Sequence, residues 1–197
     1  MRGGGEAPVT VSIWKKIMTQ NLKNRLIEAI TRGVQVRSQV YASIKLEDKQ
    51  LLGPPTSIED IDLLEKTCGH KLPPSYRAFL GLHNGWRMVD GATDLLSVQE
   101  MLVEPIAEEI REWQTFMAEE GETALAEGLV VGFGTIAPSS IVLDFSHVDN
   151  NGECKVIDCD KIEFFEYDSF IQWLEDAIIE YEEILNHSGN GDKSQSS

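Results

Sequence analysis

The sequence has no long apolar run, so it offers no segment suited to crossing a membrane. A transmembrane helix needs about 20 consecutive apolar residues, whereas the hydrophobic residues here, 42% of the chain, are dispersed. The first ten residues, MRGGGEAPVT, also lack the apolar stretch of a secretory signal. We therefore expect a cytoplasmic protein without membrane contact, and a length of 197 residues suits one domain with flexible ends.

Cysteine and histidine are both scarce, which limits disulfide and metal chemistry. The three cysteines are an odd number and do not make a disulfide framework, so reduced, packed thiols are the better interpretation. None of the four histidines has a second histidine or a cysteine at zinc-ligand spacing. We predict neither a metal site nor a cofactor.

Basic residues are few, and they are unevenly placed. The chain has 17 Lys and Arg against 33 Asp and Glu, a net charge of −16. Residues 1–52 carry a net charge of +5, and residues 53–197 carry −21. Such an acidic body repels a phosphate backbone and attracts a basic partner at long range. A surface that only keeps the protein soluble is an equally good interpretation of the acids.

Two stretches imitate ligand-binding motifs, and both fail on their surroundings. Gly132–Ala137 has the letters of a dinucleotide fingerprint, but Pro138 and a strand-like segment follow where a helix must hold the pyrophosphate. The turn at Asp149 suggests a calcium loop, which needs glycine at its sixth position, whereas Gly152 is the fourth residue. No other catalytic constellation is present. We predict no catalytic residues and expect that the protein is not an enzyme.

Apolar periodicity changes along the chain from helical to strand-like and back. Helical spacing is found over 12–30, 58–68, 106–117 and 170–181, whereas 31–55 is ambiguous. Strand-like segments joined by short connections, which favour antiparallel pairing, are found at 129–131, 141–145, 154–157 and 161–166. The sequence predicts an α+β fold with N-terminal helices, an antiparallel sheet meander covered on one face by helices, and a C-terminal helix.

The stretch Leu72–Trp86, LPPSYRAFLGLHNGW, reads as a short helix with its two ends. Two prolines suit the first turn of a helix, where a missing N–H costs nothing. We expect His83 in the last helical turn and Asn84-Gly85 at the C-cap, because these residues tolerate positive φ. Trp86 then opens an acidic loop.

Several motifs occur in an order that resembles a known family. They are Trp14-x-x-Ile17, Ile58-x-x-Ile61-x-x-Leu64-Glu65, Cys68-Gly69-His70-Lys71-Leu72-Pro73, Tyr76-x-x-Phe79-Leu80, Asn84-Gly85, Ile141-Val142-Leu143-Asp144, Asn151-Gly152 and Ser169-Phe170-Ile171-Gln172-Trp173-Leu174. Over roughly residues 12–180 the chain is similar to the SUKH superfamily, which contains the yeast Smi/Knr cell-wall regulators and many bacterial immunity proteins. One departure is Trp86, which stands where the family usually has a glycine.

The resemblance implies a non-enzymatic protein-binding domain. Bacterial members look like immunity proteins that bind and block a toxin encoded beside them, often a nuclease or deaminase. Fungal members look like signalling adaptors, which is the alternative function. On this basis we expect a disordered segment over 1–11, one SUKH-like domain over 12–185 and a disordered tail over 186–197. The expected partner is a protein, for example a basic toxin domain, and not nucleic acid; the chain itself would be a monomer or a homodimer.

The acidic loops supply the candidate partner-binding residues. Toxins that cleave nucleic acid need basic grooves, and an acidic protein can fill such a groove and associate quickly by electrostatic steering. An aromatic side chain surrounded by acids is a plausible anchor for such an interface, although a core position for Trp86 and a solvated role for the acids are the open alternative. The candidates are Trp86, Asp90, Asp94, Asp144, Asp149, Glu153, Asp158 and Asp160.

Overall fold

The structure is a computed structural model that describes residues 9–43, 45, 52–91, 93–134, 138–160 and 163–190, without the side chains of residues 9–18, 184 and 187–190. The chain termini for which we predicted disorder lie partly outside this range. The first helix already begins at Val9 and the last ends at Asn190, so the predicted boundaries at 12 and 185 fall inside helices. Among the described residues, no helix combines the length and apolar character that a bilayer crossing requires.

Five strands form one antiparallel sheet in chain order, β1-β2-β3-β4-β5. Their bounds are β1 (Thr93–Leu95), β2 (Leu129–Gly134), β3 (Ser139–Val148), β4 (Cys154–Asp160) and β5 (Glu163–Tyr167). The register between β2 and β3 shifts between Val130 and Gly132, and a Cβ on Gly132 would lie 2.6 Å from the Ile141 side chain. The glycines Gly132 and Gly134 therefore belong to an irregular strand and not to a nucleotide-binding turn.

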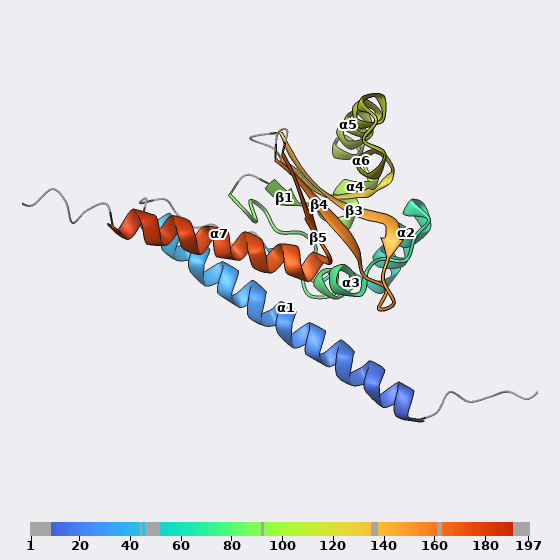
Figure 1. Ribbon diagram of the computed structural model, residues 1–197, viewed down its shortest axis with the longest axis horizontal. Helices are drawn as coiled ribbons and strands as arrows, with labels where there is room; N and C mark the ends of the chain where they lie inside the picture. The colour runs from blue at the N-terminus through green and yellow to red at the C-terminus, as the bar shows by residue number, and fades with distance from the viewer. Residues whose placement is uncertain are drawn as a thin grey trace, which may run out of the picture.

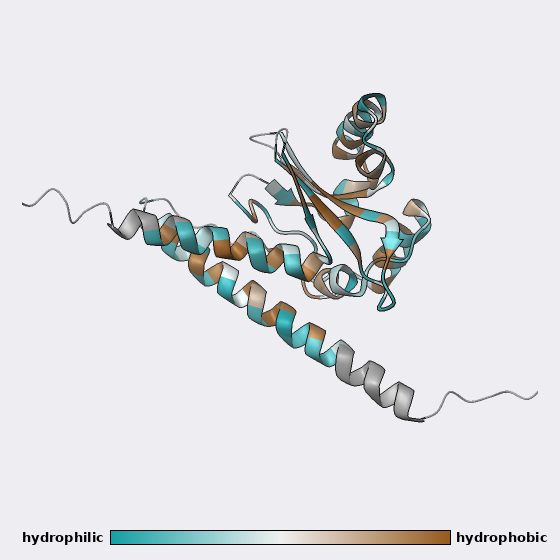
Figure 2. Ribbon diagram, in the orientation of Figure 1, coloured by the Kyte–Doolittle hydropathy of each residue, from teal (hydrophilic) through white to brown (hydrophobic). Residues whose placement is uncertain are grey.

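One face of the sheet packs against four helices and holds the larger core. These helices are α1 (Val9–Ser43), α2 (Ile58–Cys68), α3 (Pro74–Leu80) and α7 (Phe170–Asn190). Trp173, Tyr76 and Phe79 are among its largest fully buried side chains, and they form one core cluster with inward residues of the strands. Figure 2 shows hydrophobic stretches along the strands and along α1 and α7. Burial of these aromatic side chains, together with the aliphatic ones around them, supplies the main favourable free energy of folding.

Helices α1 and α7 lie side by side and run in the same direction (Figure 1). Arg25 pairs with Glu175 and Arg32 with Glu182, and the partners in each pair are 150 positions apart. A constant offset means parallel helices, and the seven-residue step between the pairs equals one heptad. The residues between the helices also follow three- and four-residue steps, as in a coiled-coil seam: Leu26, Ile30, Gly33, Arg37 and Val40 on α1, and Ile171, Leu174, Ile178 and Tyr181 on α7.

A second, smaller helical cluster packs against the opposite face of the sheet. It consists of α4 (Val98–Leu102), α5 (Ile106–Glu120) and α6 (Thr123–Glu127). Ile110 of α5 and Leu125 of α6 pack there against Val130, Val142 and Ile157 of the strands. The predicted α+β class, antiparallel meander and C-terminal helix are confirmed. The prediction that helices cover one face of the sheet is incomplete. The strands carry apolar residues on both faces, and helices cover both of them.

The helix in the Leu72–Trp86 stretch ends earlier than predicted. Pro73 is the N-cap and Pro74 the first residue of α3, as expected, but the C-cap is Gly81 with a φ of −68°. His83 therefore follows the helix, and its Nδ1 lies 3.0 Å from the Gly53 carbonyl oxygen. Gly85 has a φ of +90° in the next turn, where a Cβ would lie 2.8 Å from the Leu95 carbonyl oxygen. The stretch holds two glycines, and the prediction used the wrong one as the helix terminator.

Candidate functional site

Three of the predicted contact residues converge on one concave surface. Asp90 comes from the loop before β1, and Asp158 and Asp160 come from β4. With Glu180 of α7 they surround a hollow of about 160 Å³, which we call the acidic hollow. The described residues that line it are Asp90, Thr93, Ser139, Asp158, Asp160, Phe165, Tyr167 and Glu180. None of these lining residues is a lysine or arginine, so the hollow suits a cation.

Asp158 is the most perturbed carboxylate of the acidic hollow. Burial is the main cause that raises the pKa of Asp158 to about 6; a hydrogen bond from Trp173 works against it, and the nearby charges of Asp90 and Asp160 add to it. In that bond the Trp173 indole Nε1–H donates to Oδ2 of Asp158 over 2.7 Å. The fully buried tryptophan thus fixes the carboxylate at the base of the hollow, where its negative charge is costly and open to neutralisation by a partner.

Sequence reasoning missed the contributions of α7 and β5 to the hollow, which are Glu180 on α7 and Phe165 and Tyr167 on β5. Burial raises the pKa of Glu180, and the charges of Asp158, Asp176 and Asp90 add to the effect. Burial also raises the pKa of the Tyr167 hydroxyl, which donates to Oδ2 of Asp176 over 3.1 Å. Glu180 follows two apolar positions of the helical stripe and looks like any solvated helix residue in the sequence. No sequence signal places it opposite β4.

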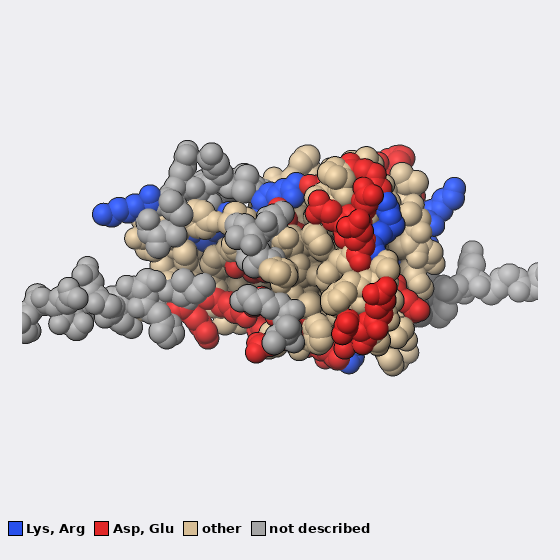
Figure 3. Space-filling view, turned by 90° about the horizontal axis from the view of Figure 1, so that it is seen from above, with Lys and Arg blue, Asp and Glu red and all other residues tan. Residues whose placement is uncertain are grey.

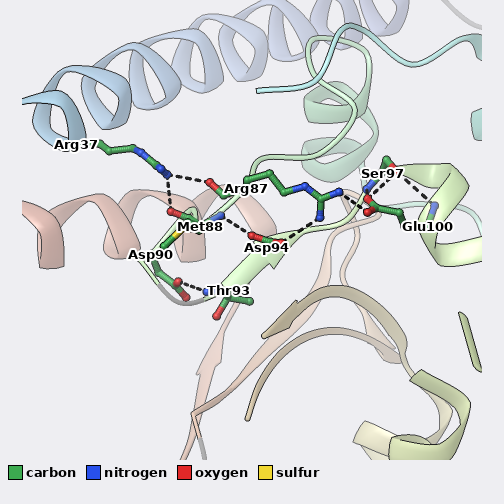
Figure 4. A network of polar contacts seen from close by, with 8 residues as sticks. All are labelled: Arg37, Arg87, Met88, Asp90, Thr93, Asp94, Ser97 and Glu100. Carbon is green, nitrogen blue, oxygen red and sulfur yellow. Dashed lines mark hydrogen bonds and ion pairs between the residues drawn. The ribbon is translucent and has the colours of Figure 1, made fainter. Parts of the chain in front are cut away.

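A buried arginine on α1 positions the loop that carries Asp90. Arg37 is 4% exposed, and its Nη1 donates to the carbonyl oxygens of Arg87 over 2.8 Å and of Met88 over 2.6 Å (Figure 4). Within the loop, Oδ1 of Asp90 accepts the Thr93 N–H over 2.6 Å, which closes the turn toward β1. The rim of the acidic hollow is therefore held from α1, although α1 does not line the hollow itself.

An ion-pair network holds the other end of the same loop. Oδ2 of Asp94 accepts from the Arg87 guanidinium over 3.0 Å, and its Oδ1 accepts the Met88 N–H over 2.7 Å. Arg87 also pairs with Glu100, which in turn completes a capping box with Ser97 at the start of α4 (Figure 4). Asp94 is 6% exposed. Its predicted role at the surface is wrong, because the backbone folds over the carboxylate.

Comparison with protein families assigns residues 55–176 of this architecture to a known group. The matching family model is the SMI1 / KNR4 family (SUKH-1). The chain belongs to the SMI1/KNR4 family. The match covers more than half of the sequence and includes the sheet, the acidic loop and the start of α7. The curated proteins searched include no match to the chain.

Trp86 is a core residue of this SMI1/KNR4 domain, which is the alternative that the sequence left open, and it is not an exposed anchor. Its side chain is 2% exposed, and its backbone pairs with Leu95 through two hydrogen bonds of 2.9 Å. The indole reaches Gly33 of α1, where a Cβ would lie 2.8 Å from Cη2. The large ring fills the space that a helical glycine leaves. The tryptophan therefore connects the loop to α1 and is not accessible to a partner.

The remaining predicted contact residues of the SMI1/KNR4 domain stabilise local structure. Glu153 accepts the Ser75 N–H over 2.8 Å and the Ser75 hydroxyl over 2.6 Å, which holds the first turn of α3 from the turn between β3 and β4. Asp144 is 7% exposed, and its Oδ1 accepts the Ser146 N–H over 2.8 Å. Asp149 is exposed and accepts the N–H groups of Asn151 and Glu153 in its turn. Only Asp90, Asp158 and Asp160 of the eight candidates line one site.

The acidic hollow opens beside an exposed aromatic pair on an edge strand. Phe164 and Phe165 of β5 are 46% and 49% exposed, although large apolar side chains are usually buried. Seen from above, acidic side chains form several patches on the molecule with few lysines and arginines between them (Figure 3). A surface that combines exposed aromatic rings with carboxylates favours a protein partner of opposite charge.

A larger cavity of about 350 Å³ lies on the other side of the domain and has different chemistry. Its lining includes Cys68, His70 and Phe145, and the His70 and Phe145 rings stack with centroids 4.5 Å apart. Burial raises the pKa of the Cys68 thiol, which leaves it protonated and a poor nucleophile. Among the described residues, no group of three or more His, Cys, Asp and Glu side chains is arranged to hold a metal ion.

Proposed function

We propose that this SMI1/KNR4 domain is a non-enzymatic cytoplasmic inhibitor that binds and neutralises a basic toxin. The observation that carries the proposal is the acidic hollow, in which Asp90, Asp158, Asp160 and Glu180 gather without a lining lysine or arginine among the described residues. A basic side chain inserted there would offset the negative charges that contribute to the raised pKa of Asp158 and of Glu180. The family assignment supports a protein-binding role.

The charge of the whole chain supports a toxin that acts on nucleic acid. Such a toxin needs a basic groove for phosphates, and a body of net charge −16 is steered toward that groove at long range. Steering raises the association rate, while the desolvated charge pairs in the hollow slow dissociation. Both effects matter for an inhibitor that must capture its toxin before the toxin acts.

Co-expression tests the proposal directly. The chain is produced with each protein encoded by the adjacent genes, and survival of cells that express a lethal neighbour is scored. We expect rescue by the native chain, and loss of rescue in the triple variant Asp158→Asn/Asp160→Asn/Glu180→Gln. The matched control Glu108→Gln/Glu112→Gln/Glu119→Gln removes the same charge from exposed positions of α5 and should still rescue. If no neighbour is lethal or bound by the purified chain at low salt, the proposal fails.

A regulatory adaptor of the cell-wall-signalling type is the second candidate, and one observation favours it. Arg25 and Arg32 of the basic N-terminal part pair with Glu175 and Glu182 of the acidic body. A basic segment that docks on its own domain can compete with a partner for the same acids. This candidate predicts binding to a folded host protein, measured by affinity capture and titration, and no lethal gene product beside it.

A further inference from the structure

The strand at the open end of the sheet carries an inference that rests on the proposed function and deepens it. We propose that the β5 edge, residues Glu163–Tyr167, binds an extended basic segment of the partner as a sixth strand. Strand addition of this kind uses the unpaired N–H and C=O groups of an edge strand for affinity, and alternate side chains for specificity. The acidic hollow then selects which segment is added.

The two edges of the sheet differ in how they are protected. At the β1 edge, Trp86 forms an antiparallel bridge with Leu95, and a second antiparallel bridge joins Trp86 to Leu52. These two bridges cover the outer side of β1. By contrast, β5 pairs with β4 alone, and no described residue pairs with its outer side. Natural sheets cover or interrupt such edges because an open edge invites another strand. The β5 edge is thus the available position.

The side chains of β5 present different chemistry on the two faces of the sheet. The register sets Phe165 beside Asp158 and Phe164 beside Cys159. Because successive strand residues point to opposite faces, Phe165 lies on the side of the acidic hollow and Phe164 on the side of α5. An added strand would therefore meet carboxylates and a ring on one face, and an exposed ring on the other.

These faces specify the occupant as a segment that alternates basic and apolar residues. Its lysines or arginines would lie over the exposed Phe165 ring and point toward Asp158 and Asp160, which combines cation–π attraction with ion pairing. Its apolar residues would cover Phe164. A second copy of this chain fits poorly, because the charged residues of β5 are Glu163 and Glu166, so its edge brings carboxylates and no lysine or arginine to the hollow.

A peptide of seven residues, acetyl-Lys-Val-Lys-Val-Lys-Val-Lys-amide, tests the proposal against the intact chain. The control peptide is N-methylated at the backbone nitrogen of every residue. This change keeps all side chains and charges but removes the backbone N–H donor of each residue. We expect the methylated peptide to bind roughly tenfold or more weakly, because the strand hydrogen bonds are lost. Amide exchange should slow in Phe164–Tyr167 when the first peptide binds and stay unchanged in Thr93–Leu95.

Charge variants complete the test. Asp160→Asn should weaken peptide binding several-fold, whereas Glu119→Gln on α5, which removes the same charge elsewhere, should not. Equal affinity of the two peptides, or no binding at about 1 mM peptide, a concentration that detects even weak complexes, overturns strand addition. A concentration-dependent dimer that protects the β5 amides also overturns it. Rescue from a lethal neighbour that Asp160→Asn and Phe165→Pro leave intact would keep the proposed function and remove this inference.

Discussion

At the scale of single residues, Asp158 of the acidic hollow carries a negative charge that burial makes unfavourable, and a hydrogen bond holds its carboxylate in place. Asp158 is held by Trp173, yet burial keeps its pKa near 6, above the ordinary value of 3.8. A carboxyl whose pKa is raised by folding stabilises the fold only when it is protonated. The stabilising contribution is complete below pH 3.8 and is lost as the pH rises through about 6. At neutral pH the residue therefore reduces stability, which is the usual cost of a binding site.

The variant Asp158→Asn should make the protein more stable at neutral pH. Asparagine keeps an oxygen that can accept the Trp173 bond and carries no charge. From the size of the pKa shift we expect a gain on the order of 1–3 kcal/mol in the free energy of unfolding at pH 7.5, falling toward zero near pH 4. Urea unfolding at both pH values measures it. Glu119→Gln, at an exposed position, should change stability little, and a loss of stability in Asp158→Asn at pH 7.5 would contradict the prediction.

Residue identity predicted Asp90, Asp158 and Asp160 of the acidic hollow, but it missed Glu180 and did not show which acids stabilise local structure. The sequence shows that Asp90, Asp94, Asp144 and Asp158 are acidic and near turns or strands, and nothing in it separates those that accept local backbone bonds from those that line the hollow. That separation depends on which strand pairs with which, and on Arg37 and Arg87 reaching carbonyl and carboxylate groups far along the chain. Long-range pairing of this kind leaves no local pattern.

At the scale of elements, the strongest local patterns predicted the fold correctly. The strands β2 to β5, helix α2 and the stripe of α7 follow from apolar periodicity, because local geometry alone determines them. Helix α1 was predicted only to residue 30. Its second half carries Gly33 and Arg37 at positions that an apolar stripe would fill, and these residues are explained only by Trp86 and the loop that they contact.

The contact between Gly33 and Trp86 gives a prediction with an unusual sign. In most helices a change from glycine to alanine stabilises by up to about 1 kcal/mol, because alanine has the higher helix propensity. At Gly33 the new Cβ would lie 2.8 Å from the Trp86 ring and 3.0 Å from Ile178. We therefore expect Gly33→Ala to destabilise by about 1–3 kcal/mol, as overpacking does.

Thermal and urea unfolding check this effect, and a second variant isolates its cause. Trp86→Phe removes the atoms that the alanine meets, so the double variant Gly33→Ala/Trp86→Phe should lose less stability than the sum of the two single variants. The pair Lys23→Gly and Lys23→Ala, at an exposed position of the same helix, measures the difference in helix propensity between glycine and alanine alone. Gly33→Ala with increased stability would show that α1 moves away from Trp86 at little cost.

At the scale of the whole molecule, the net negative charge opposes the compact state and attracts molecules of opposite charge. A net charge of −16 on 197 residues produces repulsion between like charges, and folding increases this repulsion because it brings the charges closer together. The ion pairs between α1 and α7 relieve part of it. The charge was readable from the sequence, but its gathering at β4, β5 and α7 was not, because it depends on sheet topology.

Salt should stabilise this protein, since it screens repulsion over distances longer than the Debye length. Raising NaCl from about 20 mM to about 300 mM shortens that length from roughly 20 Å to 6 Å. We expect the free energy of unfolding at pH 7.5 to rise by about 1 kcal/mol, measured by urea titration. Equal results with KCl would separate screening from specific ion binding. A fall in stability would mean that the surface ion pairs outweigh the repulsion.

The parallel seam between α1 and α7 also constrains how the chain folds as it is made. The partners Arg25 and Glu175 are 150 positions apart, so the apolar stripe of α1 stays uncovered until α7 has left the ribosome. At roughly 5–20 residues per second, that delay lasts on the order of ten seconds or more. During this interval the basic early helix and its exposed seam are available to chaperones. In the folded molecule α1 and α7 pack against each other, so the seam of α1 is covered only after α7 has been made.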